Sequence, residues 1–343
     1  MPHDLSLPRA PDYFIDRLAD LHGRIRDRLW KLSTRASVDN LSAVAAPREG
    51  DTIFAIDLHA EEVLDDFFSA WGEDLPLLVV AEGFPGDGGR TFPEGTPRES
   101  VAFTCIVDPI DGTRGLMYGK RSGWTLTAVA PAPVKVLPSL SDIRVAMQTE
   151  LPTARSHLSD VLWAVEGRGA LAETHNLESG EVRPFHPRPS GAESLLYGFA
   201  TVAKFFPGGK VLAAEIEERL SSELFGSVGD GNPQIFDDEY IASGGQIYEL
   251  IVGHDRFVAD LRPVLQAAVG TARLCAHTYD LCTELIARET GVEVTDVRGR
   301  RLRYPLDIRV NCGWVGYANA ALRARVEPVL RKVLSDLGLP TEL

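Results

Sequence analysis

Two short apolar runs, each ending close to an acidic residue, constrain the fold of this 343-residue chain most strongly. Residues 75–80 and 101–107 are the right length for buried strands and too short for ordinary helices. Glu82 follows the first run after Ala81, and Asp108 follows the second directly. We therefore expect a buried sheet with carboxylates at the carboxyl ends of its strands.

Helical periodicity accounts for much of the remaining apolar sequence. Residues 12–32 and 58–71 carry apolar side chains at three- and four-residue spacing, which predicts two amphipathic helices. Asp57 lies where an extended segment enters the second of these. Residues 271–286 carry Asp280 into another apolar helical pattern, which ends at Thr290 and Gly291.

The rest of the chain alternates between strand and helix signals. We predict strands at residues 124–129, 197–202 and 292–294, a hairpin over 161–173, and helices at 210–220 and 243–252. Residues 131–157 and 178–194 have the composition of insertions. A boundary near residue 190 would divide the chain into an N-terminal α+β half, residues 1–190, and a C-terminal α/β half, residues 191–343.

Charge and cysteine content exclude several classes of function. A formal charge of −14, from 49 acidic and 35 basic residues, disfavours nucleic-acid polymers and anionic membranes as partners. No window contains the roughly 18 apolar residues of a membrane span, and the start of the chain lacks a secretory signal. Four cysteines without CxxC spacing predict buried thiols in a reducing compartment, so we expect a cytoplasmic protein.

Five acidic residues lie at the edges of apolar elements rather than on charged faces: Asp57, Glu82, Asp108, Asp111 and Asp280. Carboxylates in such places are costly to bury unless a cation joins them. A cluster of oxygen ligands suits Mg2+, and no HExxH or cysteine-based zinc spacing competes. Each residue alone also has an ordinary explanation, since Asp111 with Gly112 is a common turn pair and Asp280 could cap a helix.

A six-residue motif makes the interpretation more specific: Asp108-Pro109-Ile110-Asp111-Gly112-Thr113. It resembles the metal-binding signature of the inositol monophosphatase superfamily, and Asp57, Glu82 and Asp280 follow that family's order. The resemblance covers residues 12–314. It implies a layered αβαβα sandwich of the sugar-phosphatase type, within the α+β class, and Mg2+-dependent hydrolysis of a phosphomonoester.

The resemblance also implies roles for individual residues, with two or three Mg2+ ions at the site. A first ion would be held by two side-chain carboxylates, a carbonyl and a hydroxyl: Glu82, Asp108, the backbone of Ile110, and Thr113. A second ion would be held by Asp108, Asp111 and Asp280. Asp57 would orient the attacking water together with Thr113, and Glu82 would take part in catalysis as a ligand.

Substrate contacts are expected at the end of the motif. Gly112 and Thr113 would open a helix whose N–H groups meet the phosphate, with Arg114 beside them. Asp260 is a candidate acid for a substrate hydroxyl. Lys120 and Arg121, together with Arg114, are candidates for binding a second anionic group.

Two departures from the family pattern leave the substrate open. Gly83 follows Glu82 where many members have a second acid, and Tyr279 precedes Asp280 where a tryptophan is common. The leading interpretation is hydrolysis of a small phosphorylated polyol or sugar such as an inositol monophosphate. The alternatives are a fructose-1,6-bisphosphatase, a 3'(2'),5'-bisphosphate nucleotidase, or a catalytically weakened homologue that binds a phosphorylated ligand or a partner. A homodimer is the expected assembly.

Overall fold

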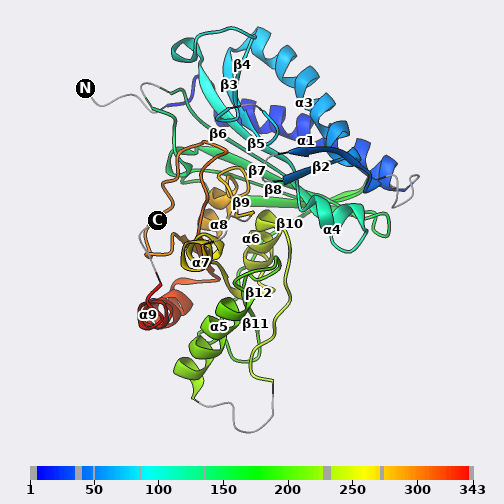
Figure 1. The fold of residues 1–343 in the computed structure, drawn as a ribbon. Helices are drawn as coiled ribbons and strands as arrows, with labels where there is room; N and C mark the ends of the chain where they lie inside the picture. Colours follow the sequence, from blue (N-terminus) through cyan, green and yellow to red (C-terminus); the bar gives the residue numbers. More distant parts are fainter. Residues whose placement is uncertain are drawn as a thin grey trace.

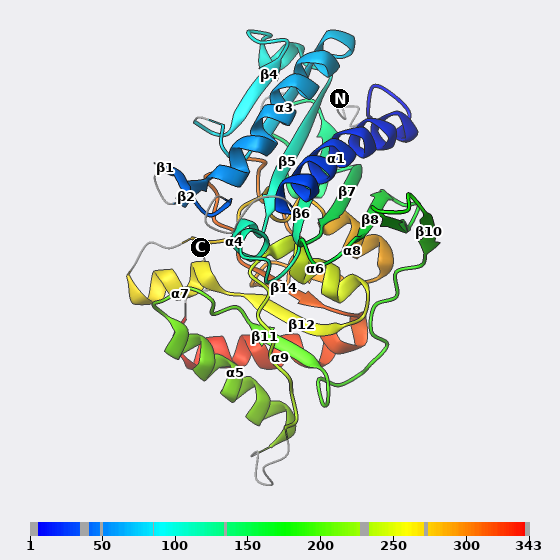
Figure 2. The same ribbon diagram turned by 90° about the vertical axis from the view of Figure 1, so that its right-hand side faces the viewer.

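The computed structural model describes residues 6–34, 41–48, 51–84, 86–133, 136–226, 233–270 and 274–339. In this part of the chain, helices and sheets alternate in five layers, helix–sheet–helix–sheet–helix (Figures 1 and 2). The predicted α+β layered sandwich is therefore confirmed.

The central element is an eight-stranded sheet with the order β10-β9-β8-β7-β6-β5-β3-β4. Strands β3 and β5 pair in parallel, and the other neighbours pair antiparallel. Its strands are β3 (Leu77–Ala81), β4 (Gly89–Phe92), β5 (Phe103–Asp111), β6 (Gly123–Pro131), β7 (Val145–Leu151), β8 (Leu158–Val165), β9 (Ala170–Asn176) and β10 (Val182–Phe185). A separate hairpin pairs β1 (Val44–Arg48) with β2 (Asp51–Phe54).

Two long helices, α1 (Pro11–Ser33) and α3 (Ala55–Asp74), lie side by side on one face of this sheet (Figure 2). The apolar stripe of α1 is buried there, including Phe14, Leu18 and Ile25, as its periodicity predicts. Side chains alternate along a strand, so Leu77 of β3 joins this core and Leu78 joins the opposite one. Apolar residues on both faces explain why the run at residues 75–80 shows no polar alternation.

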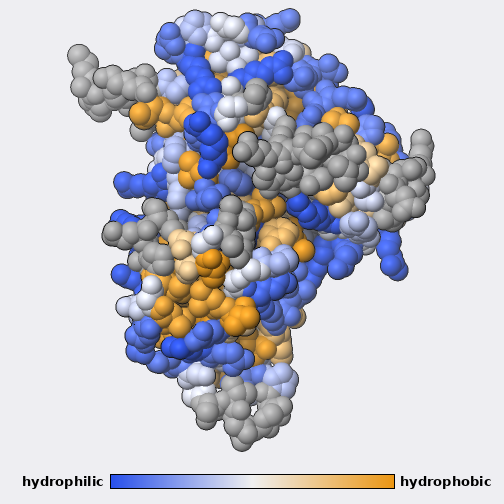
Figure 3. Space-filling view, viewed as in Figure 1, coloured by the Kyte–Doolittle hydropathy of each residue, from blue (hydrophilic) through white to orange (hydrophobic). Residues whose placement is uncertain are grey.

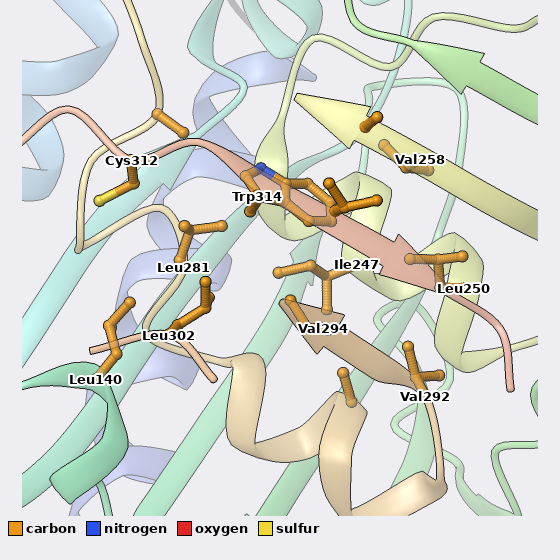
Figure 4. Packing of buried hydrophobic residues seen from close by; sticks show 14 of the residues in the cluster. Leu140, Ile247, Leu250, Val258, Leu281, Val292, Val294, Leu302, Cys312 and Trp314 are labelled. Carbon is orange, nitrogen blue, oxygen red and sulfur yellow. The ribbon is translucent and has the colours of Figure 1, made fainter. Parts of the chain in front are cut away.

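The opposite face is covered by α6 (Ser243–Ile251) and α8 (Glu284–Thr290), and then by a four-stranded sheet. That sheet has the order β11-β12-β14-β13: β11 (Phe199–Val202), β12 (Asp255–Asp260), β14 (Trp314–Tyr317) and β13 (Glu293–Thr295). The outer layer contains α5 (Lys210–Phe225) and α9 (Ala320–Asp336), whereas α7 (Arg262–Val269) follows β12. Figure 4 shows Trp314, Ile247 and Leu281 packed in the core between the two sheets.

Two sequence predictions about local structure are wrong. Residues 131–157 contain β7, which lies between β6 and β8 inside the large sheet and is not an insertion. The late helix begins only at Glu284, so Asp280 lies in the preceding turn; residues 271–273 lie outside the described part. In the 178–194 segment, β10 forms a strand at the sheet edge.

Surface and thiol features complete the fold. Apolar residues gather over α5 and α7 on the face seen in Figure 3, where Val211 is 84% exposed and Val269 is 42% exposed. All four cysteines are buried and free, as predicted. Among the described residues, every helix is too short or too polar to cross a bilayer.

Candidate metal centre

A bulge in β5 brings Asp108 and Asp111 to the same side of the strand. Residues three apart on a regular strand point to opposite faces. Here the pairing with β6 slips between Asp108, opposite Leu126, and Asp111, opposite Trp124, so three steps on β5 match two on β6. Pro109 lies inside the bulge, where its missing N–H costs no ladder hydrogen bond.

Acidic residues from two other segments join this pair. Glu82 follows β3, whose last residue Ala81 pairs with Val107, so Glu82 lies beside the end of β5. Asp280 arrives from the turn before α8, and its Oδ2 accepts a 2.6 Å hydrogen bond from the N–H of His277. Carboxylate oxygens of Asp108, Asp111 and Asp280 all lie within 4.8 Å of one another, in a group that could hold a metal ion.

Burial and mutual repulsion raise the pKa values of the two β5 carboxyls well above the ordinary aspartate value. For Asp108 the largest cause is loss of hydration, followed by the charges of Glu82, Asp111 and Asp280. For Asp111 it is again loss of hydration, followed by the charge of Asp280. A cation at this position would relieve both penalties, because it favours the ionised form.

Backbone N–H groups hold both carboxylates in place. Asp108 Oδ1 accepts from the N–H of Ile110 at 3.0 Å, a bond within the bulge itself. Asp111 Oδ2 accepts from the N–H of Gly244 at 2.6 Å, at the beginning of α6. The second half of the chain therefore orients a carboxylate from the first half.

Asp57 and Thr113 meet at the edge of the same site. The Thr113 hydroxyl lies 3.1 Å from Asp57 Oδ1 and 2.9 Å from the carbonyl oxygen of Ile110, either of which can accept its proton. Asp57 Oδ2 accepts the N–H of Phe54 at 2.8 Å, which fixes the start of α3. Its position at the junction of β2 and α3 is as predicted.

Gly112 forms the junction between β5 and the short helix α4 (Thr113–Met117). Its φ of +86° is in the left-handed region, and an added Cβ would lie 2.9 Å from the Cβ of Ala242. Only glycine fits this position without strain. Thr113 and Arg114 then enter the wall of a hollow of about 560 Å3 that is open to solvent.

Most of the residues that the sequence singles out line the hollow. Its predicted members are Glu82, Asp108, Ile110, Asp111, Gly112, Thr113, Arg114 and Asp280. Asp57 contacts it through Thr113. Lys120 and Arg121 are not among its lining residues, and Arg121 pairs with Asp238 instead. These two basic residues are therefore poor candidates for binding a second anion.

Asp260 is fully buried and does not line the hollow. Its carboxylate pairs with Arg262, whose Nε lies 2.8 Å from Oδ1, so it is not available to bind a substrate hydroxyl. Arg262 itself lines the hollow, together with Phe205 and Phe206. No sequence pattern indicates these three residues, because their proximity to the acidic cluster depends on how the second sheet packs. Ser243, which also lines the hollow, is the first residue of α6, close to the start of the helix that the sequence predicts at residues 243–252.

Neither a family model nor a curated protein sequence matches the chain. Solved structures do match it. An inositol monophosphatase from Thermotoga maritima aligns with a TM-score of 0.60 at 16% identity, covering 95% of this chain and 100% of that one. The extragenic suppressor protein of Bartonella henselae gives 0.61 at 17%, covering 93% and 99%. Fructose-1,6-bisphosphatase from Leishmania major gives 0.66 at 13%, covering 95% and 99%.

These alignments span both sheets, because each covers more than nine-tenths of this chain and almost all of its counterpart. At 13–17% identity they concern the fold. The chain has the fold of these inositol monophosphatase and fructose-1,6-bisphosphatase structures.

Proposed function

We propose that this protein is a Mg2+-dependent phosphomonoesterase that hydrolyses a small phosphorylated polyol or sugar. The observation that carries the proposal is the cluster of Asp108, Asp111 and Asp280, buried or half-buried at the base of a solvent-open hollow, with their oxygens within 4.8 Å. The structures of similar fold include an inositol monophosphatase and a fructose-1,6-bisphosphatase. They support phosphate-ester hydrolysis as the class of reaction. The substrate has to be inferred from the residues of this chain.

The donor set fits a small hard cation. All the candidate ligands are oxygens: three aspartates, Glu82, and the carbonyl of Ile110 beside Thr113. Such a set suits Mg2+ and not the softer metals that thiolate or imidazole ligands select. Bound Mg2+, as two or three ions, would activate a water and stabilise the negative charge on the phosphate and the leaving oxygen.

The residues of the chain supply position and proton acceptance. Asp57 and Thr113 form a hydrogen-bonded pair at the edge of the hollow, and a water held there can give its proton to the carboxylate. Gly112, Thr113 and Arg114 form the adjacent wall, where a phosphate group can lie against the start of α4. Attack by water on such a phosphate needs no covalent intermediate with the protein.

Gly83 lies in the turn after β3 with a φ of +94°, in the left-handed region that favours glycine. The turn therefore accounts for the absence of a second acid after Glu82. We propose that Glu82 alone serves as the ligand from this segment.

The proposal is tested by phosphate release from a panel of inositol, sugar and nucleotide monophosphates, with Mg2+ and with chelator. We expect Mg2+-dependent release that Asp111→Asn reduces by at least about a thousandfold, since it removes a ligand charge. Asp20→Asn on the exposed face of α1 is the matched control and should retain turnover. A folded wild-type protein that releases no phosphate from any compound would instead support a ligand-binding homologue.

We also propose a homodimer in the cytoplasm, as the resemblance and the thiol content lead us to expect. Light scattering at several protein concentrations tests the assembly. A mass of one chain throughout would exclude the dimer.

A further inference from the structure

We propose that Arg262 forms an anion-binding subsite, so that the preferred substrate carries a second anionic group besides the phosphate that is hydrolysed. This inference rests on the proposed phosphatase function and names its substrate class. The second group is a carboxylate or another phosphate. The contacts of Arg262 carry the inference.

Arg262 is held rigidly at the wall of the hollow. Its Nε donates to Asp260 Oδ1 at 2.8 Å and lies 3.0 Å from Oδ2, its Nη2 also binds Asp260, and its Nη1 donates to the carbonyl of Leu274 at 2.9 Å. The guanidinium also lies over the ring of Phe205, 4.6 Å from the centroid. A group held by this many contacts loses little freedom when it binds a ligand.

The guanidinium of Arg262 has N–H groups left that can donate hydrogen bonds to a ligand. Five N–H bonds are present on an arginine side chain, and Asp260 and Leu274 account for three of them among the described residues. One N–H on each terminal nitrogen is left, on a residue that is only 8% exposed and lines the hollow. These two charged N–H donors can bind the oxygens of a carboxylate or phosphate.

The surroundings favour an anion over a neutral hydroxyl at this position. Asp260 is fully buried and already neutralised by Arg262, so it cannot accept from a sugar hydroxyl as sequence reasoning expects. The positive charge of Arg262 therefore lies nearer the hollow than the negative charge of Asp260. Phe206 contacts two cations: the guanidinium carbon of Arg262 lies 5.8 Å from its ring centroid, and that of Arg114 lies 5.6 Å from it.

Arg114 and Arg262 both contact Phe206, and all three residues line the hollow together with Asp108 and Asp280. A substrate with its reacting phosphate at the carboxylate cluster would direct its other end toward Arg262. Because the hollow is open to solvent, the substrate can extend along this wall beyond the carboxylate cluster.

The experiment compares kcat/KM within two pairs of esters that differ by one anionic group. The pairs are glycerol 3-phosphate with 3-phosphoglycerate, which adds a carboxylate, and fructose 6-phosphate with fructose 1,6-bisphosphate, which adds a phosphate. We expect the doubly anionic member of at least one pair to be preferred by about 10- to 100-fold, the range for a buried charge-assisted hydrogen bond. The pair that shows the preference identifies which anion binds.

The variants remove the guanidinium of Arg262 without leaving a buried charge unpaired. The selectivity ratio is kcat/KM for the doubly anionic ester divided by kcat/KM for its singly anionic partner. In the double variant Asp260→Asn with Arg262→Gln, this ratio should fall to within about threefold of one. Arg262→Lys keeps the ion pair with Asp260 and should lower the ratio by about tenfold. Lys120→Gln removes a positive charge outside the hollow and should leave the ratio unchanged. A wild-type ratio near one, or a ratio that survives the double variant, would overturn the proposal.

Binding provides a readout that does not depend on turnover. Calorimetry with Asp57→Asn protein in Mg2+ should show the same preference for the doubly anionic compound, and the double variant in that background should lose it. Selective binding without phosphate release by the wild type would mean that the proposed reaction is wrong while the subsite is right. Release without selectivity would mean the reverse.

Discussion

The N–H of Gly244 donates a 2.6 Å hydrogen bond to Oδ2 of Asp111, which joins the first turn of α6 to the end of β5. The two residues are 133 positions apart in the chain. Because Asp111 is buried and its neighbours are acidic, this N–H is one of the few groups that stabilise its ionised form. The position of the candidate metal ligand therefore depends on the packing of a helix from the other half of the chain.

Gly244→Ala should displace Asp111. An added Cβ would lie 2.8 Å from Asp111 Oδ2 and 2.6 Å from Leu126 Cδ2, and Leu126 is fully buried. We expect a loss of about 1–3 kcal/mol in the free energy of unfolding and at least about a tenfold loss in Mg2+-dependent kcat/KM. Denaturant unfolding and phosphate release measure the two effects.

Gly23→Ala is the matched control. Gly23 lies within α1, and a Cβ there meets nothing within 4 Å. Alanine should raise the free energy of unfolding by about 0.5–1 kcal/mol because it is the better helix former. Equal losses in both variants would show that the contact with Asp111 has no special role.

Asp111→Asn should stabilise the metal-free protein while removing its response to Mg2+. The folded protein raises the pKa of Asp111, so this group contributes stability at low pH that is lost as the pH rises through its folded-state pKa. Asparagine avoids that loss and can still accept the Gly244 N–H. We expect the variant's Tm in chelator at pH 7.5 to be at least about 2 °C higher, the order of shift that 1 kcal/mol produces in a long chain.

The same scan in Mg2+ should reverse the order, because only the wild type keeps the full ligand set. The difference in Tm in chelator should also shrink as the pH is lowered, when Asp111 becomes protonated in the wild type. A variant less stable than the wild type in chelator would show that repulsion within the cluster is already balanced by other groups.

Asp57→Asn should separate metal binding from turnover. The amide can keep the N–H of Phe54 as a donor and so preserve the start of α3, but it cannot take a proton from water. We expect kcat to fall by about a hundredfold or more, while the Mg2+ concentration for half-maximal stabilisation changes by less than about threefold. If the required Mg2+ concentration rose by as large a factor as kcat fell, Asp57 would be a metal ligand and not a proton acceptor.

Much of this site was predictable because strand ends and glycine turns leave local signals. Asp57, Glu82 and Asp108 are each adjacent to an apolar run, and Gly112 marks the turn between β5 and α4. The sequence does not show the bulge, which depends on the register against β6. It therefore cannot establish that Asp108 and Asp111 point to one side.

Features formed by distant packing were missed for the same reason. Arg262 reaches the hollow only because β12 and α7 place it there, whereas Asp260 pairs with that arginine and does not line the hollow. The strand β7 was missed because its flanks are rich in proline and serine, although its first five residues are all buried inside the sheet. Tertiary packing overrides local composition in both cases.

His22 should make the protein acid-sensitive at a distance from the candidate metal centre. Its ring lies fully buried between α1 and the large sheet, with Nδ1 2.8 Å from Thr149 Oγ1 and Nε2 2.8 Å from Thr127 Oγ1. Burial lowers its pKa to about 3, because the charged ring would lose its hydration. The neutral ring therefore contributes stability that is complete above the unfolded pKa, near 6.5, and is lost as the pH falls toward 3.

The free energy of unfolding should accordingly fall by up to about 1.4 kcal/mol per pH unit from this group between pH 6 and 4. His22→Gln is not titratable and can still bond one threonine hydroxyl, so its stability should fall less steeply over that interval even if it is lower at pH 7. Urea unfolding of both proteins in chelator at pH 4.5, 5.5 and 6.5 measures the two slopes. Parallel slopes would place the acid sensitivity in other groups, since all other titratable residues are shared by the two proteins.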